Sequence, residues 1–325
     1  MKTLRKVLTV LVVISITLSW GMTAEAAGKK YLSIATGGTG GVYYLIGAGI
    51  AKVMTKYAPN IEATSETTAA GAENTRLLGT KQCEVALLDE TALRSTVAKT
   101  PGFKVEDFRA IFSGHPMFSH IFVYTDSPVK EITDFKGKKV AVGAPASGNE
   151  IIAKAVFEEY KLTYNDFKPQ WLSFAEQASA FKDKSIDVGI ITAGVPTSSV
   201  VDITTTVPIR FLSLPENRVK SIENRHPAFF PNILPAKTYK GQTAAIMGIG
   251  SSGTITVHKD MDEKTAYWLC KVISEHYKEL AEIHPAGNDY RLERVYDGIG
   301  IPFHPGAIKY LTEVGVWQKR PARFK

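Results

Sequence analysis

The stretch from Tyr31 to Tyr57, YLSIATGGTGGVYYLIGAGIAKVMTKY, reads as a strand, a glycine-rich turn and a helix in direct succession. Tyr31 to Ala35 alternate apolar and small residues as a strand does, and four glycines between positions 37 and 41 supply backbone conformations that other residues resist. The helix that follows exposes free N–H groups in its first turn, where the helix dipole favours a carboxylate or phosphate. The alternative is a tight turn without a ligand, so other segments must decide between the two readings.

The first 26 residues have the pattern of a secretory signal peptide. Three basic residues precede an apolar run from Val7 to Leu18, and the AEA at 24–26 has the form of a cleavage site. The apolar run is shorter than the ~20 residues of a membrane helix. We therefore expect a periplasmic or otherwise extracytoplasmic protein after cleavage; an uncleaved N-terminal anchor is the alternative.

Charge and cysteine usage exclude several classes of function. Removing the signal subtracts three basic residues and one acidic residue from 39 Lys plus Arg and 32 Asp plus Glu, which leaves a net charge of about +5. The basic residues are spread along the chain without interleaved aromatics, which disfavours a nucleic-acid-binding function. Cys83 and Cys270 have no metal or redox spacing. Cys270 lies in the apolar phase of an expected helix, which favours two separately buried thiols over a disulfide.

Strand-like and helix-like segments alternate in two series, which predicts an α/β fold with a mostly parallel sheet covered by helices. The first series has strands at 31–36, 61–66 and 85–88, with helices up to 57 and at 72–78. The second has a strand at 139–142, a glycine-containing turn, a helix at 150–160, and strands at 170–173, 188–192 and 209–214. We expect the last third to supply an extended segment at 247–257, one helix at 262–283 and closing helices.

A nucleotide-binding site is the first rival function. The glycine cluster lacks the GxGxxG form because Tyr43 stands three positions after Gly40, although Glu66 could imitate the acid that binds a ribose. The chain also contains no GxxxxGK[ST] phosphate loop.

An exported hydrolase centred on Ser147 is the second rival. Ser147 lies at a strand-to-helix turn, but the surrounding GAPASGN is not GxSxG. The seven histidines show neither HExxH nor a helical ligand pair, and we expect most of them at the surface or in loops. No complete catalytic constellation is present, so catalysis is disfavoured and no metal site is expected.

Five segments, in order, resemble a known family: TGGTGGVYYLIGAGIA at 36–51, TTAAGAENTRLL at 67–78, GAPASGNE at 143–150, LSFAEQASAFKDKSIDVGIITAGVPTSSV at 172–200 and IPFHPGAIKYLTEVG at 301–315. With them the chain resembles the TAXI subfamily of solute receptors for TRAP transporters. The resemblance implies a two-lobed periplasmic-binding-protein fold, type II-like, with a ligand cleft between the lobes. It also implies no enzymatic activity and no cofactor. The implied partners are a glutamate-like amino acid or an organic carboxylate and a TRAP membrane permease. We expect the receptor itself to be a monomer.

The two glycine-rich turns and the segments after neighbouring strands supply the candidate ligand contacts, because hydroxyls and free helix amides can meet a carboxylate there. They are Gly38, Thr39, Tyr43, Tyr44, Thr68, Asn74, Ser147, Gly148, Asn149, Gly194, Val195 and Thr197. Tyr43 and Tyr44 are adjacent, so we expect one of them to face the cleft. Gly71 stands where the family usually has a serine, and Asp89-Glu90-Thr91 stands where it commonly has Gln, a small residue and Asp, so a relative's ligand cannot be assumed.

Asp89 and Glu90 complete the candidate site. A carboxylate at the end of a strand beside the cleft would repel a second ligand carboxylate and attract an ammonium, which predicts an amino acid over a plain dicarboxylate. The alternative is that Asp89 caps the following helix. We expect residues 28–118 plus 250–325 to form one lobe and 119–249 the other, closing about a hinge.

Overall fold

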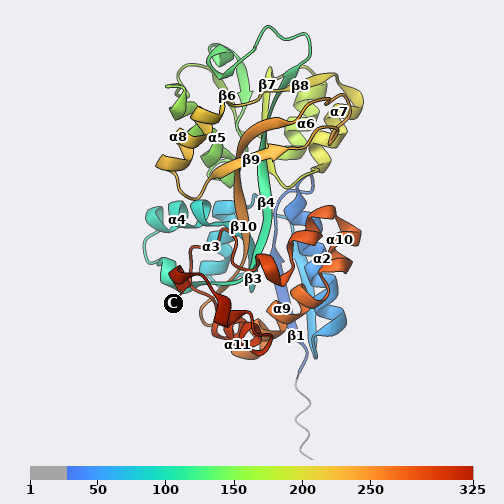
Figure 1. The fold of residues 1–325 in the computed structure, drawn as a ribbon, viewed down its shortest axis with the longest axis vertical. Helices are drawn as coiled ribbons and strands as arrows, with labels where there is room; N and C mark the ends of the chain where they lie inside the picture. Colours follow the sequence, from blue (N-terminus) through green and yellow to red (C-terminus); the bar gives the residue numbers. More distant parts are fainter. Residues whose placement is uncertain (1–27, 325) are drawn as a thin grey trace, which may run out of the picture. The chain divides into compact units, whose positions relative to one another are not determined.

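The computed structural model describes residues 28–324, in which a compact unit begins at Tyr31. The predicted signal peptide lies outside the described residues. One mixed sheet runs through the unit in the order β2-β1-β3-β10-β4-β7-β5-β6, with β8 paired to β4 and β9 paired to β10. In Figure 1, β4 and β10 run side by side between helices α2 to α4 at one end and α5 to α8 at the other.

The strands are short except for two. Their bounds are β1 Lys30–Ala35, β2 Ile61–Glu66, β3 Val85–Asp89, β4 Phe108–Tyr124, β5 Lys139–Ala141, β6 Lys168–Gln170, β7 Val188–Ala193, β8 Ile209–Phe211, β9 Phe230–Leu234 and β10 Ile246–His258.

An α-helix follows each strand from β1 to β8 except β4. Their bounds are α2 Val42–Tyr57, α3 Gly71–Gly79, α4 Glu90–Lys99, α5 Gly148–Glu159, α6 Phe174–Lys182, α7 Ser198–Thr206, α8 Glu216–Arg225, α9 Glu263–Glu275, α10 Tyr277–Ile283 and α11 Pro305–Glu313. Single 3₁₀ turns lie at Val105–Asp107, Ile132–Phe135, Pro285–Asp289, Leu292–Arg294, Trp317–Lys319 and Ala322–Phe324.

The strands β4 and β10 pair antiparallel along most of their length, and the ladder shifts register near its middle. At that point Gly114 and Gly253 touch through their backbones, since a Cβ on Gly114 would lie 2.7 Å from the carbonyl carbon of Gly253. Irregular pairing of this kind bends a sheet locally. The two long strands therefore carry the chain across the middle of the unit.

Buried apolar side chains form a terminal core and a central core. The terminal core joins residues 32–112 with residues 255–311, so both ends of the described chain contribute to it. The central core consists of two clusters drawn from residues 118–249. Burial of apolar surface on this scale is the main stabilising contribution to such a fold.

The sheet corrects the expectation of mostly parallel strands. Pairs β1–β3, β5–β6 and β5–β7 are parallel, but β10 and β4 are antiparallel to each of their partners. The prediction failed because β4 was not recognised as a strand: Gly114 and Pro116 interrupt its apolar run. The expected α/β alternation is nevertheless present on both sides of β4.

Two further expectations were wrong in detail. The single helix expected at 262–283 is divided at His276, whose backbone leaves helical geometry and whose ring stacks on Tyr57 with centroids 3.5 Å apart. The strand expected at 170–173 ends at Gln170, because Ser173 already caps α6 by accepting a hydrogen bond from the N–H of Glu176. Capping competes with strand extension for the backbone of these residues.

Cys83 and Cys270 are both free and buried, as the sequence indicated. Across residues 28–324, none of the helices combines the length and the apolar character needed to cross a membrane.

Candidate functional site

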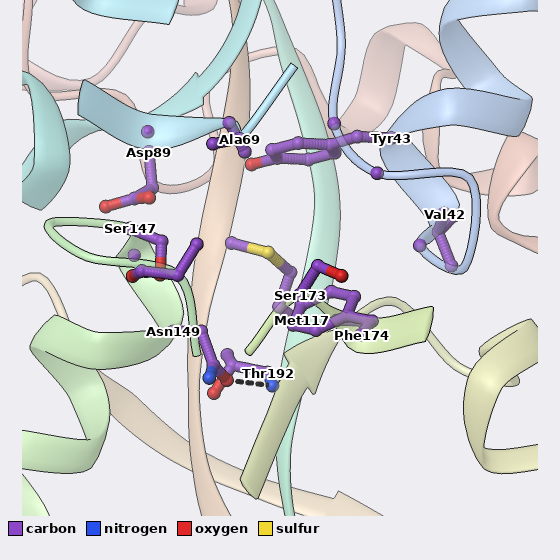
Figure 2. Close-up of a pocket in the computed structure, with 18 of the residues that line it drawn as sticks. Val42, Tyr43, Ala69, Asp89, Met117, Ser147, Asn149, Ser173, Phe174 and Thr192 are labelled. Atoms are coloured by element: carbon purple, nitrogen blue, oxygen red, sulfur yellow. Dashed lines mark hydrogen bonds between the residues drawn. The ribbon is translucent and has the colours of Figure 1, made fainter. Parts of the chain in front are cut away.

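A cavity of about 110 Å³ lies between elements that belong to the two cores (Figure 2). It is several times larger than the ~10–15 Å³ that a single water needs, so it has room for a small organic molecule. Eight of the predicted site residues line it: Gly38, Tyr43, Thr68, Asp89, Ser147, Gly148, Asn149 and Gly194. The two glycine-rich turns singled out in the sequence therefore meet at one cavity.

Four helices begin at the cavity wall. Residues of the first turns of α2, α3, α5 and α6 line it, namely Val42, Gly71, Gly148 and Phe174. Gly41, the residue before α2, provides no side-chain cap, so the first amides of that helix have no side-chain acceptor. Helix starts of this kind attract anions through their free N–H groups and their dipoles.

Asp89 lines the cavity and also caps α4. Its Oδ1 accepts a hydrogen bond of 2.9 Å from the N–H of Ala92, and its other oxygen lies against Gly148 of α5. Burial raises the pKa of Asp89, while hydrogen bonds from the α4 backbone oppose the rise. The sequence left open whether Asp89 caps a helix or faces the ligand site. In the structure it does both: it caps α4 and lines the cavity.

Tyr43 is the member of the tyrosine pair that lines the cavity, and Tyr44 does not. The Tyr43 hydroxyl is buried and has no hydrogen-bond partner. Burial, with Asp89 as the next contributor, raises its pKa well above the usual value, so the phenol keeps its proton. A buried O–H without an acceptor is unfavourable, which makes it a donor available to a ligand.

Sequence reasoning missed His115, Met117 and Thr192, which also line the cavity. His115 and Met117 stand two residues apart on β4, so they project from the same face of that strand. Thr192 lies near the end of β7, and its hydroxyl has no partner, like Nε2 of His115. The alternation of positions 115, 117 and 119 could have signalled this face had β4 been recognised.

Two asparagines hold helices α3 and α5, which line the cavity, in place through hydrogen bonds to neighbouring backbone carbonyls. Asn74 of α3 donates to the carbonyl oxygens of Thr36 and Leu87, and its Oδ1 accepts from the Thr68 hydroxyl. Asn149 of α5 donates to the carbonyls of Val142, which follows β5, and Ile190 of β7. It accepts from the backbone N–H of Thr192, a bond drawn dashed in Figure 2. Asn74 itself does not line the cavity, so it positions the wall from behind.

Ser147 is engaged as a helix cap. Its hydroxyl donates to the carbonyl of Ala144 at 2.7 Å and accepts from the N–H of Glu150 at 3.2 Å. The bond from Glu150 is that of an N-cap and the bond to Ala144 closes the preceding turn, and neither supplies the general base that a nucleophilic serine needs.

Besides Asn74, five predicted residues lie outside the cavity lining: Thr39, Tyr44, Glu90, Val195 and Thr197. Glu90 instead pairs with Arg94 at 2.6 Å, which shows that Asp89 is the carboxylate directed inward. Thr197 donates its hydroxyl hydrogen to the carbonyl of Gly40 at 3.0 Å, and Ser199 reaches the same oxygen with its hydroxyl and its N–H. This group of three donors on one carbonyl joins the α7 start to the turn before α2.

Four of the seven histidines, His226, His276, His284 and His304, lie at helix ends outside the strands, in keeping with the expectation for most of them. His115 and His120 are exceptions: both lie in β4, are buried, and form hydrogen bonds within the protein interior. Burial lowers the pKa of His115 to about 3 and that of His120 to about 4, so both rings are neutral at physiological pH.

The electrostatic character of the cavity follows from its lining. Among the described residues, Asp89 is its only carboxylate, and no Lys or Arg contributes to it. Residues 28–324 also hold no cluster of three or more metal-ligating side chains. A bound anion would therefore be held by backbone amides and neutral side-chain donors.

Several solved structures share this fold. They include the periplasmic aliphatic sulphonate binding protein SsuA from Escherichia coli (18% identity, 87% of this chain and 83% of that chain, TM-score 0.50). The alkanesulfonate-binding protein SsuA from Xanthomonas axonopodis pv. citri, bound to MOPS, is 16% identical over 91% of this chain and 86% of that chain, with a TM-score of 0.53. PhnD1 from Prochlorococcus marinus, in complex with methylphosphonate, is 11% identical over 81% of this chain and 92% of that chain, with a TM-score of 0.54. The chain thus has the α/β periplasmic-binding-protein fold that the sequence predicted.

The comparison with protein families gives one match, over residues 34–315, to the NMT1-like family. The match contains every residue that lines the cavity.

Proposed function

The chain belongs to the NMT1-like family, and we propose that it is an exported solute receptor that binds a small carboxylate or amino acid and delivers it to a membrane transporter. In this role it is a binding protein and not an enzyme. The proposal combines the fold with the chemistry of the cavity, because a fold alone does not determine function.

One observation carries the proposal: unpartnered polar atoms gather at the cavity. Tyr43 Oη, His115 Nε2 and Thr192 Oγ1 are buried, have no hydrogen-bond partner, and belong to residues that line it. Buried polar atoms are normally satisfied, so their concentration here supports a polar ligand.

We further propose that residues 28–118 plus 250–325 form one lobe and 119–249 the other, with the ligand between them. The separation into a terminal and a central core supports this division. In this division β4 and β10 each pass from one proposed lobe to the other, and we call these two points the crossings. The contact between Gly114 and Gly253, at the register shift of β4 and β10, lies close to both crossings. Closure about these crossings would enclose the ligand.

The ligand class follows from charge. The helix starts and the neutral donors suit a carboxylate, while Asp89 suits an ammonium group. An amino acid of glutamate-like size meets both requirements, whereas a plain dicarboxylate would bring a second negative charge toward Asp89. The sulphonates and phosphonate named for the proteins of similar fold are anions too, and an organic anion without an amine is the competing ligand class.

For the partner, we propose a TRAP-type permease, on the motifs that resemble TAXI receptors, and a periplasmic location. Solutes of the proposed class should enter cells that carry the receptor and this permease. Deleting the permease gene while keeping the receptor should abolish that uptake, and unchanged uptake would disprove the assigned partner.

The direct test is identification of the ligand. Mass spectrometry of the material released by denaturing the purified protein should find an unmodified amino acid or carboxylate, and a thermal-shift screen of both classes should find stabilisation. Ligand at about 100 times its dissociation constant adds ~2.7 kcal/mol to the free energy of unfolding.

Tyr43→Phe and Tyr44→Phe form a matched pair for that screen, because the first removes a hydroxyl from the cavity wall and the second does not. We expect only Tyr43→Phe to weaken binding. Small-angle scattering should show compaction when the ligand is added. Turnover of a substrate that is lost in Ser147→Ala, or a screen in which no small molecule stabilises the protein, would refute the proposed function.

A further inference from the structure

His115 and Tyr290 form a buried pair behind the cavity wall. Nδ1 of His115 lies 3.0 Å from the hydroxyl oxygen of Tyr290, and both side chains are at most 1% exposed. Tyr290 follows the 3₁₀ turn Pro285–Asp289 and does not itself line the cavity. Its hydroxyl can therefore act on a ligand only through His115.

The position of the protons follows from the available acceptors. Burial raises the pKa of Tyr290, partly opposed by a hydrogen bond from the backbone of His115, so the phenol keeps its proton. Within residues 28–324, the acceptor that the Tyr290 O–H reaches is Nδ1 of His115. Since His115 is neutral, Nδ1 accepts this hydrogen and the proton of the ring resides on Nε2. The opposite tautomer would leave a fully buried O–H without an acceptor.

His115 lines the cavity, and Nε2 is the other nitrogen of its ring. It is buried without a partner and faces Gly194, where a Cβ would stand 2.8 Å from it. A side chain at position 194 would collide with this edge of the ring, so the glycine keeps the space beside the nitrogen free of protein atoms. The ring of Tyr43 packs edge-on against His115 with centroids 5.5 Å apart, and the Tyr43 hydroxyl is a second buried donor without an acceptor.

We propose that Tyr290 fixes His115 as the Nε2–H tautomer, so that this N–H and the Tyr43 hydroxyl together hold one carboxylate of the bound ligand. The inference rests on the proposed function for the identity of the ligand group, but its account of the tautomer does not. Both donors are neutral, so they add no charge that would oppose the electrostatic role of Asp89. Asp89 lines the same cavity, so the ammonium of an α-amino acid held in this way can meet its carboxylate.

His120 is an internal reference on the same strand. Its Nδ1 lies 2.8 Å from the carbonyl of Ile191, an obligatory acceptor, and its Nε2 lies 2.9 Å from the Tyr239 hydroxyl. His120 must therefore carry its proton on Nδ1. The two histidines thus have opposite tautomers, each set by its neighbours, and Tyr239, like His120, lies outside the cavity lining.

Nitrogen NMR of ¹⁵N-histidine-labelled protein tests the tautomer directly, without any ligand. Assignment uses His115→Phe and His120→Phe. We expect a protonated Nε2 in His115 and a protonated Nδ1 in His120. A protonated Nδ1 in His115 would overturn the proposal whatever the protein binds.

Calorimetry with L-glutamate as the probe tests the consequence for binding. His115→Phe should weaken affinity by roughly tenfold to a hundredfold, the usual effect of losing a hydrogen bond to a charged group. Tyr290→Phe should weaken it less and should produce a mixture of tautomers in the spectrum. The control is Tyr310→Phe, which removes a hydroxyl that contacts Ser274 and Glu275 away from the cavity lining, and it should leave L-glutamate affinity unchanged. Thermal unfolding identifies variants that merely lose stability. His115→Phe alone leaves the Tyr290 hydroxyl without a partner, and the double variant His115→Phe/Tyr290→Phe removes that hydroxyl as well.

The failures are distinguishable. If His115 has the predicted tautomer but the parent does not bind L-glutamate, the ligand class in the proposed function is wrong and the tautomer assignment stands. If the parent binds L-glutamate and both His115→Phe and Tyr290→Phe bind it equally well, the proposed role of this pair is wrong and the receptor function stands.

Discussion

The carboxylate of Asp89 lies directly on Gly148, the first residue of α5, so that any side chain at position 148 would overlap the carboxylate oxygen. The contact joins the end of β3 to a helix of the other proposed lobe. A negative group at a helix start is also favoured by the helix dipole. The same contact therefore brings the two sides of the cavity together and leaves the carboxylate at the cavity wall (Figure 2).

Gly148→Ala should weaken ligand binding at least tenfold. Alanine is favourable in a helix, so the substitution should not unfold α5, but its methyl group would push Asp89 away and oppose closure. Gly38→Ala is the matched control for stability, because nothing lies within 4 Å of the added methyl group. Calorimetry and thermal unfolding of both variants check this, and unaltered affinity in Gly148→Ala would contradict the role of the contact.

Asp89→Asn should weaken L-glutamate binding more than tenfold while leaving the ligand-free protein as stable or more stable at pH 7. Asparagine caps α4 as well as aspartate does and carries no charge to desolvate. Because folding raises the pKa of Asp89, this group lowers stability as pH rises from its unfolded pKa through the folded one. Unfolding curves at several pH values should show that this loss is absent in the variant.

Affinity for dicarboxylates should rise in the same variant, because a negative charge leaves the cavity. Glu90→Gln is the control, since Glu90 pairs with Arg94 outside the cavity and its loss should not alter the preference between ligands. A parent protein that prefers 2-oxoglutarate to L-glutamate would contradict the charge argument.

Glu150→Gln should destabilise the protein by about 2–3 kcal/mol, the usual effect of losing hydrogen bonds to a charged group. Burial opposes ionisation of Glu150, but hydrogen bonds from Ala146, Trp171, Lys154 and Tyr164 outweigh it and lower the pKa. A lowered pKa means that this stabilisation is present above the unfolded pKa and is lost as pH falls through the folded one.

Melting temperatures between pH 7 and pH 3 check this prediction. The parent should lose more stability than Glu150→Gln over the acid range. The control Glu216→Gln should match the parent, because Glu216 and its partner Lys220 are both exposed. Parallel acid profiles of parent and Glu150→Gln would refute it.

Thr197→Val should weaken ligand binding two- to tenfold, as expected for one hydrogen bond of ~0.5–1.5 kcal/mol. The variant removes one of the donors that reach the Gly40 carbonyl across the proposed cleft. Thr205→Val is the control, since the Thr205 hydroxyl donates only to carbonyls of its own helix. Stopped-flow measurement of ligand release should find faster dissociation for Thr197→Val alone; equal rates in the two variants would show that this bond does not stabilise the closed form.

The apolar and glycine pattern within a segment was sufficient to predict the strand–turn–helix units. The strand, glycine turn and helix from Tyr31 to Tyr57 appear as β1 and α2, and the second such unit appears as β5 and α5. Both depend on apolar periodicity and on glycine, which act over a few residues. The order of these units predicted an α/β fold, and the resemblance to TAXI receptors implied its binding-protein form.

The long strands escaped prediction because their stability comes from partners remote in sequence. β4 contains Gly114 and Pro116, which argue against a strand locally, yet it pairs with β10 and β7 over most of its length. His115 and Met117 therefore could not be assigned to the site until β4 was placed. Strand pairing is a long-range interaction, and local propensity does not reveal it.

The sequence by itself determined which turns could bind an anion and that a carboxylate stands at the end of the strand that became β3, and it favoured separate thiols at Cys83 and Cys270 over a disulfide. Only the tertiary structure decided which of two adjacent residues faces inward: Tyr43 over Tyr44, and Asp89 over Glu90. It alone paired Tyr290 with His115 across 175 positions of sequence. The physical reason is that hydrophobic pattern and turn chemistry act between near neighbours, whereas the direction of a side chain and the position of a proton depend on what the fold brings beside them.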